Sequence, residues 1–566
     1  MAVLDKEYDV VVIGGGVNGL ACAAYLQKSG LKVAVFERRV ECGTHCCTEE
    51  LMHPGVKVNL CATLIGTLGS PSYDELELER FGLELLTSSE WAFFNPFKED
   101  RSAVLLHSWD ARKQYEAWRS INEKDAEVYR RIANYFAPYM VEWGELTRFQ
   151  NRTPEVLTRL AEILGGCPDI PPEWPTMSGI DMTEALYTDD RIKQTAYSFG
   201  ILGGYHPWEK GSGQLLAALA PVTLAPIFTF FTPRGGSHAL THALSRCLCH
   251  YGGSIFTSCP VAKIIVDNGE AKGIALSRDA VYPEAEIRAT KAVVSDLSCH
   301  PTFLDLVGED KLPPWAAEGA KAYSYEDVIL FTNYWALSEP LDWEGAGYPP
   351  EISQAFGFNF GLDTFSDVLR LKDDLEAHRP SDPPIACGLS CQGYCFADPT
   401  QAPPGQYTLM VWSNVPYDLD ELGGAQAWDD IREEYGDKVE DLLAEYVPNI
   451  KKAKIGRYCE TPLGFYRRNP SAIKGSAISG ANIASQMGEN CPFPGCGAPR
   501  TPIAKLYISN SLFPQGTADL HSGYKAADMV AQDLGVREQG WWVAKPLEPG
   551  LKVLKRRGIE VRWSVD

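Results

Sequence analysis

Hydrophobic positions at the start of the chain form two runs with a helical pattern between them. Residues 8–13 (YDVVVI) make a continuous β-branched stretch, which is typical of a strand buried on both faces of a parallel sheet. Apolar residues then recur at helical spacing over residues 20–29, and Gly30 follows at the position of a C-cap. Residues 32–36 (KVAVF) predict a second strand. The pattern therefore predicts a β–α–β unit at the start of the chain.

Three glycines occupy the turn between this first strand and the helix. Gly14 permits the tight turn, Gly16 lets the backbone approach a pyrophosphate, and Gly19 allows the helix to pack closely on the sheet. The helix N-terminus adds unpaired N–H groups and the positive end of the helix dipole. Glu37 follows the second strand and is placed to accept hydrogen bonds from the adenosine ribose hydroxyls. We therefore expect a dinucleotide site, NAD or FAD, formed by Gly14, Gly16, Val17, Asn18, Gly19 and Glu37.

The composition and charge of the chain indicate a globular protein and disfavour a nucleic-acid-binding one. The chain has 566 residues, of which 45% are hydrophobic and 22% charged, as in ordinary globular proteins. Lys and Arg total 52 against 74 for Asp and Glu, and the resulting charge of −22 repels phosphate backbones, so no nucleic-acid partner is expected. The N-terminus lacks the basic region and apolar core of a secretory signal, and the cysteines are scattered. These features predict a cytoplasmic location.

One apolar stretch, residues 215–231, has the hydropathy of a membrane span. It is about the minimum spanning length and contains Pro221 and Pro226, which favours a buried or membrane-surface segment. We therefore expect no transmembrane segment. Peripheral membrane contact through an apolar patch stays open, although the acidic charge disfavours electrostatic docking.

Residues 37–50 (ERRVECGTHCCTEE) resemble the second fingerprint of the amine-oxidase-like flavoproteins, especially their phytoene desaturase and carotenoid isomerase branch. In that family a Gly-Gly pair after the ribose-binding acid lets the chain fold back along the FAD diphosphate. This sequence has Gly43 but carries Thr44 in place of the second glycine. The resemblance implies cofactor contacts from Arg38, Gly43, Thr44 and His45.

Two later regions resemble further FAD motifs of the same family, in the family's order. Residues 232–276 resemble the block that rejoins the FAD domain, where the residue matching Val261 holds the adenine through its backbone. Residues 292–296 (AVVSD) resemble the strand that follows. Residues 505–534 resemble the C-terminal motif, in which a turn lies beside the ribityl chain and a helix begins near the flavin ring. The resemblance implies cofactor contacts here from Asn510, Gly516, Asp519 and Leu520.

The resemblance implies an α/β fold, with a Rossmann-type FAD-binding domain of the GR2-like flavoprotein kind and an inserted α+β substrate domain. The expected division has FAD-binding segments at 1–110, 231–310 and 451–535, a helical substrate segment at 111–230, a strand-containing substrate segment at 311–450, and a C-terminal tail at 536–566. The tail either packs on the body or mediates self-association, and an oligomer stays open.

Two polar residues of the C-terminal motif are candidates for proton transfer. Asp519 and His521 lie where relatives have small or apolar residues, and His is suited to proton transfer near neutral pH. The alternative is that both only cap the helix beginning near Ser522. A covalent histidyl–flavin link through His45 is a further alternative. No metal site is expected, because the cysteines lack zinc-site spacing and the family uses no metal.

The function implied by the resemblance is that of an FAD-dependent oxidoreductase of the phytoene dehydrogenase type. It would transfer hydride from a largely hydrophobic small molecule to flavin N5 and pass the electrons to an external acceptor, oxygen or a quinone. The alternatives are a redox-neutral double-bond isomerase, an amine or amino-acid oxidase, and a catalytically silent flavoprotein that serves as a partner subunit.

Overall fold

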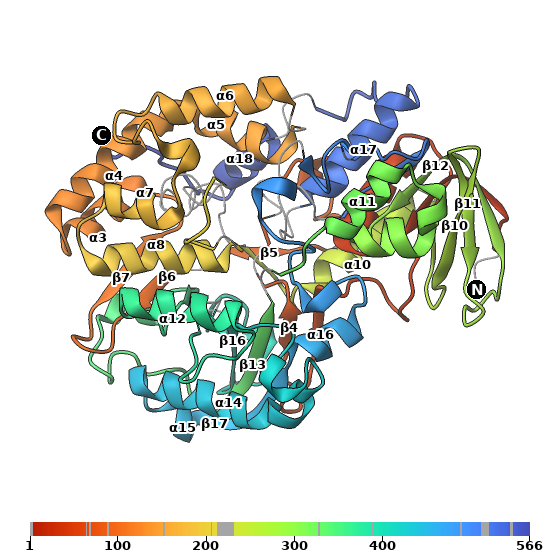
Figure 1. The fold of residues 1–566 in the computed structure, drawn as a ribbon. Helices are drawn as coiled ribbons and strands as arrows, with labels where there is room; N and C mark the ends of the chain where they lie inside the picture. Colours follow the sequence, from red (N-terminus) through yellow and green to blue (C-terminus); the bar gives the residue numbers. More distant parts are fainter. Residues whose placement is uncertain are drawn as a thin grey trace.

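Two seven-stranded sheets, each covered by helices, organise the chain (Figure 1). The computed structural model describes residues 4–63, 65–66, 70–87, 90–150, 153–204, 206–211, 231–326, 329–386, 390–392, 394–486, 490–497, 499–510, 520–543 and 547–566. Two short ribbons complete the strands: β3 (Cys46–Glu49) with β4 (Val58–Cys61), and β5 (Leu85–Thr87) with β8 (Phe231–Pro233).

The first sheet has a parallel centre and an antiparallel extension. Its strands are β1 (Glu7–Ile13), β2 (Val33–Phe36), β9 (Ser254–Phe256), β10 (Val261–Asp267), β11 (Glu270–Leu276), β12 (Glu286–Ser295) and β18 (Leu506–Ile508). The order is β10-β11-β12-β1-β2-β9, and β18 pairs with the end of β12. Strands β9, β2, β1, β12 and β18 run parallel, as predicted for a dinucleotide-binding sheet.

Alternation along β1 explains why its apolar run is continuous. Val10 and Val12 face one apolar cluster, which includes α1 (Val17–Lys28), α10 (His238–His250) and α17 (His521–Asp533). Val11 and Ile13 face a second cluster beneath the antiparallel extension, where α11 (Pro314–Ala322) packs. Both faces are therefore buried. Helix α1 begins at Val17, three residues before the expected start. The sequence pattern did not predict this first helical turn because the turn has no apolar periodicity.

The second sheet is mostly antiparallel and is formed by segments from across the chain. Its strands are β6 (Trp91–Pro96), β7 (Ala103–His107), β13 (Leu330–Leu337), β14 (Gly357–Phe358), β15 (Ser390–Cys391), β16 (Tyr407–Asn414) and β17 (Lys454–Glu460), in the order β17-β13-β16-β15-β14-β6-β7. Strands β6 and β7 precede residue 110 and β17 follows residue 450, so this sheet extends past both expected boundaries of the substrate segments.

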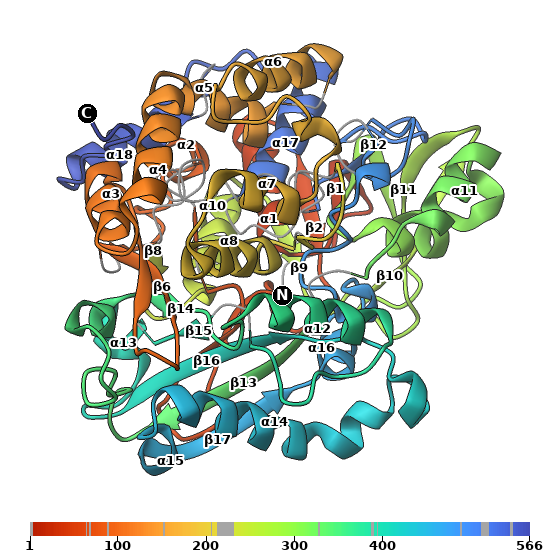
Figure 2. The same ribbon diagram turned by 60° about the vertical axis from the view of Figure 1, so that its left-hand side comes forward.

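Helices cover both faces of the second sheet (Figure 2). The acidic helix α14 (Ala427–Tyr446) packs its aromatic face on β13 and β16. The opposite face of the sheet packs against a layer of helices from residues 111–202. The helices not yet given are α2 (Ser72–Glu75), α3 (Ala111–Arg119), α4 (Glu123–Phe136), α5 (Met140–Gly144), α6 (Pro154–Gly165), α7 (Gly179–Leu186), α8 (Asp190–Leu202), α12 (Phe365–Glu376), α13 (Tyr394–Ala397), α15 (Ile450–Ala453), α16 (Pro462–Arg468) and α18 (Leu547–Arg556).

The C-terminal tail packs on the body of the protein. The rings of Trp541 and Trp542 lie 5.9 and 4.9 Å from the ring of Tyr25 on α1. Farther on, the backbone N–H of Arg562 donates to the carbonyl oxygen of Trp109, 2.8 Å away. Among the described residues, none of the helices is long and apolar enough to cross a membrane. The apolar stretch of residues 215–231 lies outside the described residues except for Phe231 in β8.

Candidate functional site

The glycine turn lies between β1 and α1, at the carboxyl end of the first sheet. Gly14 has a φ of 95°, in the left-handed region that favours glycine. A Cβ at Gly16 would lie 2.3 Å from Oδ2 of Asp296, and one at Gly19 would lie 2.6 Å from the carbonyl oxygen of Gly14. Val17 begins the helix directly above this turn. The geometry therefore requires glycine at all three positions of the motif.

Glu37 lies beside this turn, where the sequence places it. Its Oε2 accepts a hydrogen bond of 2.7 Å from the backbone N–H of Gly15, and its Oε1 accepts one of equal length from Arg39. A carboxylate oxygen has two lone pairs, so both oxygens keep capacity for the hydroxyls of a ribose. A Cβ at Gly15 would lie 3.2 Å from Glu37 Oε2 and 2.5 Å from the Cys42 sulfur, so the acid and the turn fit together only with glycine there.

Asp296, at the end of β12, lies against the same turn and was not singled out from the sequence. The Ser509 hydroxyl donates to its Oδ1 at 3.1 Å, and the backbone N–H groups of Gly16 and Gly19 donate to its carboxylate. Burial raises the pKa of Asp296 to about 7, against the opposing effect of these hydrogen bonds. The only sequence signal was the strand motif ending at residue 296, because the partners of this side chain come from two distant segments.

Helix α17 brings the C-terminal motif to the glycine turn. The backbone N–H of Gly523 donates to Oδ1 of Asn18 at 3.1 Å, which joins the first turns of α17 and α1. Leu520 precedes α17 with a φ of 66°, and His521 is its first residue; both are fully buried. Two helix N-termini, each with the N–H groups of its first turn and a positive dipole end, therefore converge on one site.

Asn510 approaches the same site from β18. Its Nδ2 donates to the carbonyl oxygen of Asp296 at 2.8 Å, while its buried Oδ1 has no hydrogen-bond partner in the described part of the chain. Such an orphaned acceptor is typical of a position that meets a ligand. The predicted residues Gly516 and Asp519 lie outside the described residues.

The loop after β2 continues along the turn. Gly43 has a φ of 89°, and its N–H donates to the carbonyl oxygen of Gly15 at 3.0 Å. The carbonyl oxygen of Thr44 accepts a hydrogen bond of 2.5 Å from Nη1 of Arg468. This loop therefore returns alongside the turn, as its resemblance to the second fingerprint implies. Arg38, also predicted to contact the cofactor, is exposed.

His45 lies in a polar cluster contributed by α16. Its Nε2 is 2.9 Å from Nδ2 of Asn469, and its ring stacks on Phe465 at 5.0 Å. Burial, helped by the Arg468 guanidinium, lowers the pKa of His45 to about 3, so the ring is neutral. Arg468 in turn forms a bidentate pair with Glu460, with Nε–Oε1 at 2.8 Å and Nη2–Oε2 at 3.0 Å.

The predicted adenine side lies next to Glu37. The backbone N–H of Cys259 donates to the Glu37 carbonyl oxygen at 2.8 Å, and that of Ser258 donates to the Arg39 carbonyl oxygen at 2.7 Å. Val261 follows two residues later, as the first residue of β10. The second block of the sequence motif therefore contacts the backbone of Glu37 and Arg39.

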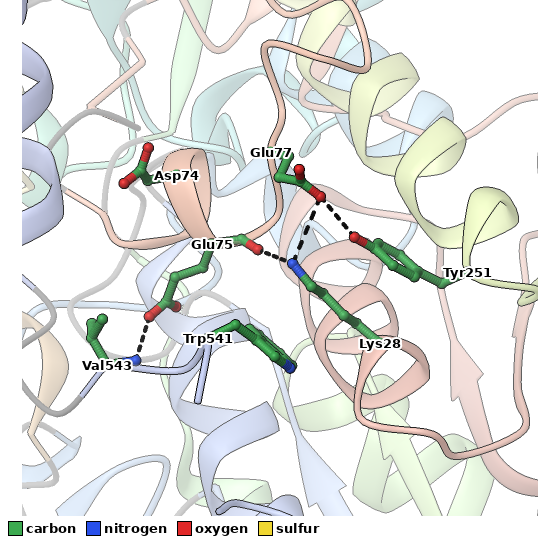
Figure 3. Close-up of a pocket in the computed structure, with 7 residues that line it drawn as sticks. All are labelled: Lys28, Asp74, Glu75, Glu77, Tyr251, Trp541 and Val543. Atoms are coloured by element: carbon green, nitrogen blue, oxygen red, sulfur yellow. Dashed lines mark hydrogen bonds and ion pairs between the residues drawn. The ribbon is translucent and has the colours of Figure 1, made fainter. Parts of the chain in front are cut away.

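A pocket of about 410 Å³ lies at the opposite end of α1 (Figure 3). Nζ of Lys28 lies 4.6 Å from the centre of the Trp541 ring and 3.9 Å from Oε2 of Glu77. Because Lys28 is the last residue of α1, a 12-residue helix, roughly 18 Å long, separates this pocket from the glycine turn. The pocket is therefore distinct from the dinucleotide site. Its lining residues are Lys28, Asp74, Glu75, Glu77, Tyr251, Trp541 and Val543.

Cysteines near the site are buried thiols. Cys42, Cys46 and Cys47 are all free and buried, and burial raises the pKa of Cys42 to about 12 and of Cys47 to about 11. They are therefore protonated and act as small apolar side chains. Cys491 and Cys496 are likewise free and buried.

The residues gathered at the end of the first sheet fit a dinucleotide. Close contacts at Gly15 and Gly16 leave no room for side chains at the turn, so a ligand can approach the backbone. The two helix N-termini can bind a diphosphate, and Glu37 can bind a ribose. The Oδ1 atom of Asn510 supplies a further unpaired acceptor.

Comparisons with known proteins agree with this geometry. The chain is 29% identical to a subunit of the limonene dehydrogenase of Castellaniella defragrans, over 95% of this chain and 96% of that protein. It is 26% identical to the rat pyridine nucleotide-disulfide oxidoreductase domain-containing protein 2, over 94% of each. The solved structure of cyclohexylamine oxidase from Brevibacterium oxydans shares the fold, with a TM-score of 0.57, 14% identity, and coverage of 93% of this chain and 99% of that one.

The family model described as FAD dependent oxidoreductase matches residues 9–295, which run from β1 to the end of β12 and so include the glycine turn and Glu37. The cofactor of this site is accordingly FAD, and the α/β fold predicted from the sequence is confirmed. With the family model spanning half of its length, the chain belongs to the FAD dependent oxidoreductase family.

Proposed function

We propose that the protein is a dehydrogenase of the phytoene desaturase-like branch, acting on a largely apolar small molecule and passing the electrons to an external acceptor. The observation that carries this proposal is the likeness to the limonene dehydrogenase subunit over 95% of the chain. That likeness spans the second sheet and its helices as well as the FAD domain, and the substrate in that relative's name is a hydrocarbon.

The apolar cluster next to His45 supports an apolar substrate. Phe465, on which His45 stacks, belongs to a buried apolar cluster built from β4, β13 and residues 465–478. The cluster is formed by Cys61, Leu330, Phe465, Ala472, Ala477 and Ile478, with Trp412 packed against it. The charged groups next to it, Arg468 and Glu460, neutralise each other. A hydrocarbon bound at this side of the cofactor would therefore meet few unpaired charges.

The chain's own residues would mainly bind, orient and exclude water. FAD, when bound, accepts the hydride at N5. The glycine turn and the N-termini of α1 and α17 hold the diphosphate, and Glu37 orients the ribose. His521 and Asp519 are the proposed proton-transfer groups, since His521 is buried at the start of α17, where the family motif approaches the flavin. The sequence offers no second strand–glycine–helix motif, which favours oxygen or a quinone as acceptor.

The test is reduction of the enzyme-bound flavin under anaerobic conditions. The purified holoenzyme is mixed with cyclic monoterpenes and longer polyenes, and in parallel with primary amines, while the flavin absorbance is followed. Bleaching by an unsaturated hydrocarbon, with stoichiometric formation of a product bearing one more double bond, is the expected result. Bleaching by amines alone would replace the proposal with amine oxidation.

The isomerase alternative gives a different signature in the same experiment. It predicts that flavin reduced beforehand with dithionite converts the hydrocarbon to an isomer, with no net consumption of acceptor. Full flavin occupancy without reduction by any of these compounds would instead support the silent partner subunit. Each outcome other than hydrocarbon-dependent bleaching overturns the dehydrogenase proposal.

A further inference from the structure

Glu41, His238 and His242 lie together at the junction of two cofactor-binding segments. Each offers one ligand atom, and these three atoms all lie within 4.8 Å of one another. The two imidazole rings are 4.1 Å apart, and Nε2 of His238 is 3.8 Å from Oε2 of Glu41. We propose that these three side chains form a binding site for a divalent transition-metal ion, with Zn²⁺ as its occupant.

Local structure explains why the two histidines converge. They are four residues apart in the first turns of α10, which places both rings on one face of the helix. Glu41 comes from a distant part of the chain, the loop between Glu37 and Gly43, and packs against that face. Two imidazoles and a carboxylate are ligands that Zn²⁺ takes at sites with three protein ligands, where water completes the tetrahedron.

The surroundings of His238 resemble those of a metal ligand. Nε2 of its ring lies 3.0 Å from the carbonyl oxygen of Cys42, the residue after Glu41. Ligating histidines commonly donate one ring N–H to a carbonyl oxygen, which fixes the ring and leaves the other nitrogen for the metal. With Nε2 donating to Cys42, Nδ1 of His238 is the nitrogen that would bind the ion. The His238 side chain is 12% exposed, whereas His242 lies at the surface, so an ion can enter from solvent.

A bound ion would connect α10 to the loop that borders the glycine turn. Gly43, two residues after Glu41, donates to the carbonyl oxygen of Gly15, and a Cβ at Gly43 would lie 2.7 Å from Cγ2 of Thr241 on α10. The proposed ion therefore joins two of the three segments that form the FAD domain. Because it binds the folded protein and not the separated segments, Zn²⁺ should raise the thermal stability of the holoprotein.

The test is zinc binding by the chelator-treated holoprotein, measured by equilibrium dialysis. His242→Ala removes the exposed ligand and should leave the fold intact, which flavin absorbance and circular dichroism will verify. We expect the wild type to bind one Zn²⁺ more tightly than the variant by at least about tenfold, and its melting temperature to rise with zinc only when His242 is present. Glu41→Gln should weaken binding in the same direction.

Two control variants separate this site from other zinc ligands in the chain. His53→Ala removes a histidine that lies outside the cluster, and Cys249→Ser removes the exposed thiol on the same helix. Both should bind Zn²⁺ as the wild type does. Co²⁺ as a spectroscopic probe should give the visible bands of nitrogen and oxygen ligands without a thiolate charge-transfer band. Unchanged zinc affinity in His242→Ala, or loss of binding in Cys249→Ser, would overturn the proposal.

Discussion

Oδ1 of Asn18 accepts a hydrogen bond of 3.1 Å from the backbone N–H of Gly523, although the two residues are 505 positions apart in the sequence. A Cβ at position 523 would lie 2.3 Å from the carbonyl oxygen of Asn18, so the backbones of α1 and α17 approach as closely as glycine permits. This contact holds together the two helix N-termini that meet at the cofactor site.

Replacing Gly523 with alanine should therefore separate the two helices. The added methyl group meets backbone rather than a flexible side chain, so relief requires α17 to shift. Overpacking of this kind costs about 1–3 kcal/mol, and we expect a loss of that size in the free energy of unfolding, together with weaker FAD retention.

Urea denaturation and FAD release on gel filtration measure these two effects. Gly540→Ala is the matched control, because a Cβ at that position would meet nothing within 4 Å. Equal stability of the two variants would contradict the packing argument.

Asp296→Asn should make the flavin-free protein more stable at neutral and alkaline pH. Because the pKa of Asp296 is raised from 3.8 to about 7, the folded protein binds a proton that the unfolded chain releases, and stability falls as pH rises between these values. Asparagine mimics the protonated acid, so the variant should gain about 2–4 kcal/mol above about pH 7.

The free energy of unfolding of both proteins, measured from about pH 4 to about pH 8, checks this expectation. The difference should shrink towards the acidic end, because the unfolded carboxyl, with its ordinary pKa of 3.8, increasingly binds the proton that the folded carboxyl already holds. A difference independent of pH would show that the carboxyl does not titrate in this range.

Glu460→Gln should destabilise the protein strongly. The carboxylate of Glu460 and the guanidinium of Arg468 have side-chain exposures of 5% and 16%, so the substitution leaves a buried positive charge without its partner. Breaking such a pair costs about 3–5 kcal/mol in the free energy of unfolding.

The neighbouring pair of Arg467 and Asp429 provides the control. It has the same bidentate form, but its side chains are 51% and 47% exposed, so Asp429→Asn should cost no more than about 1 kcal/mol. Thermal and urea unfolding of the two variants side by side measure the contrast. Similar losses would mean that burial does not govern the strength of these pairs.

Local signals in the sequence predicted the centre of the fold well. The runs at residues 8–13 and 32–36 are strands in the parallel sheet, and the glycine turn between β1 and α1 lies beside Glu37 as expected. These features depend on periodicity, on φ angles that only glycine adopts readily, and on contacts within one β–α–β unit. All three are determined by residues that are close together in the sequence.

The sequence did not predict the contacts between distant segments of the chain. Asp296 meets Ser509, and Arg468 meets the carbonyl oxygen of Thr44. His238 and His242 meet Glu41. In each case the sequence contains both partners but does not indicate that they are in contact. The two histidines are four residues apart in the sequence, but only the folded chain brings Glu41 beside them.

The sequence by itself determined the β–α–β unit, its glycine turn and the acid that follows, because each residue there is constrained by its own backbone conformation or by near neighbours. Only the tertiary structure decided that β6 and β7 join the second sheet, that α17 closes on α1, and that a carboxyl with a pKa of about 7 lies under the turn. The physical reason is that burial and pairing of side chains depend on which distant segments pack together, and packing is a property of the whole folded chain.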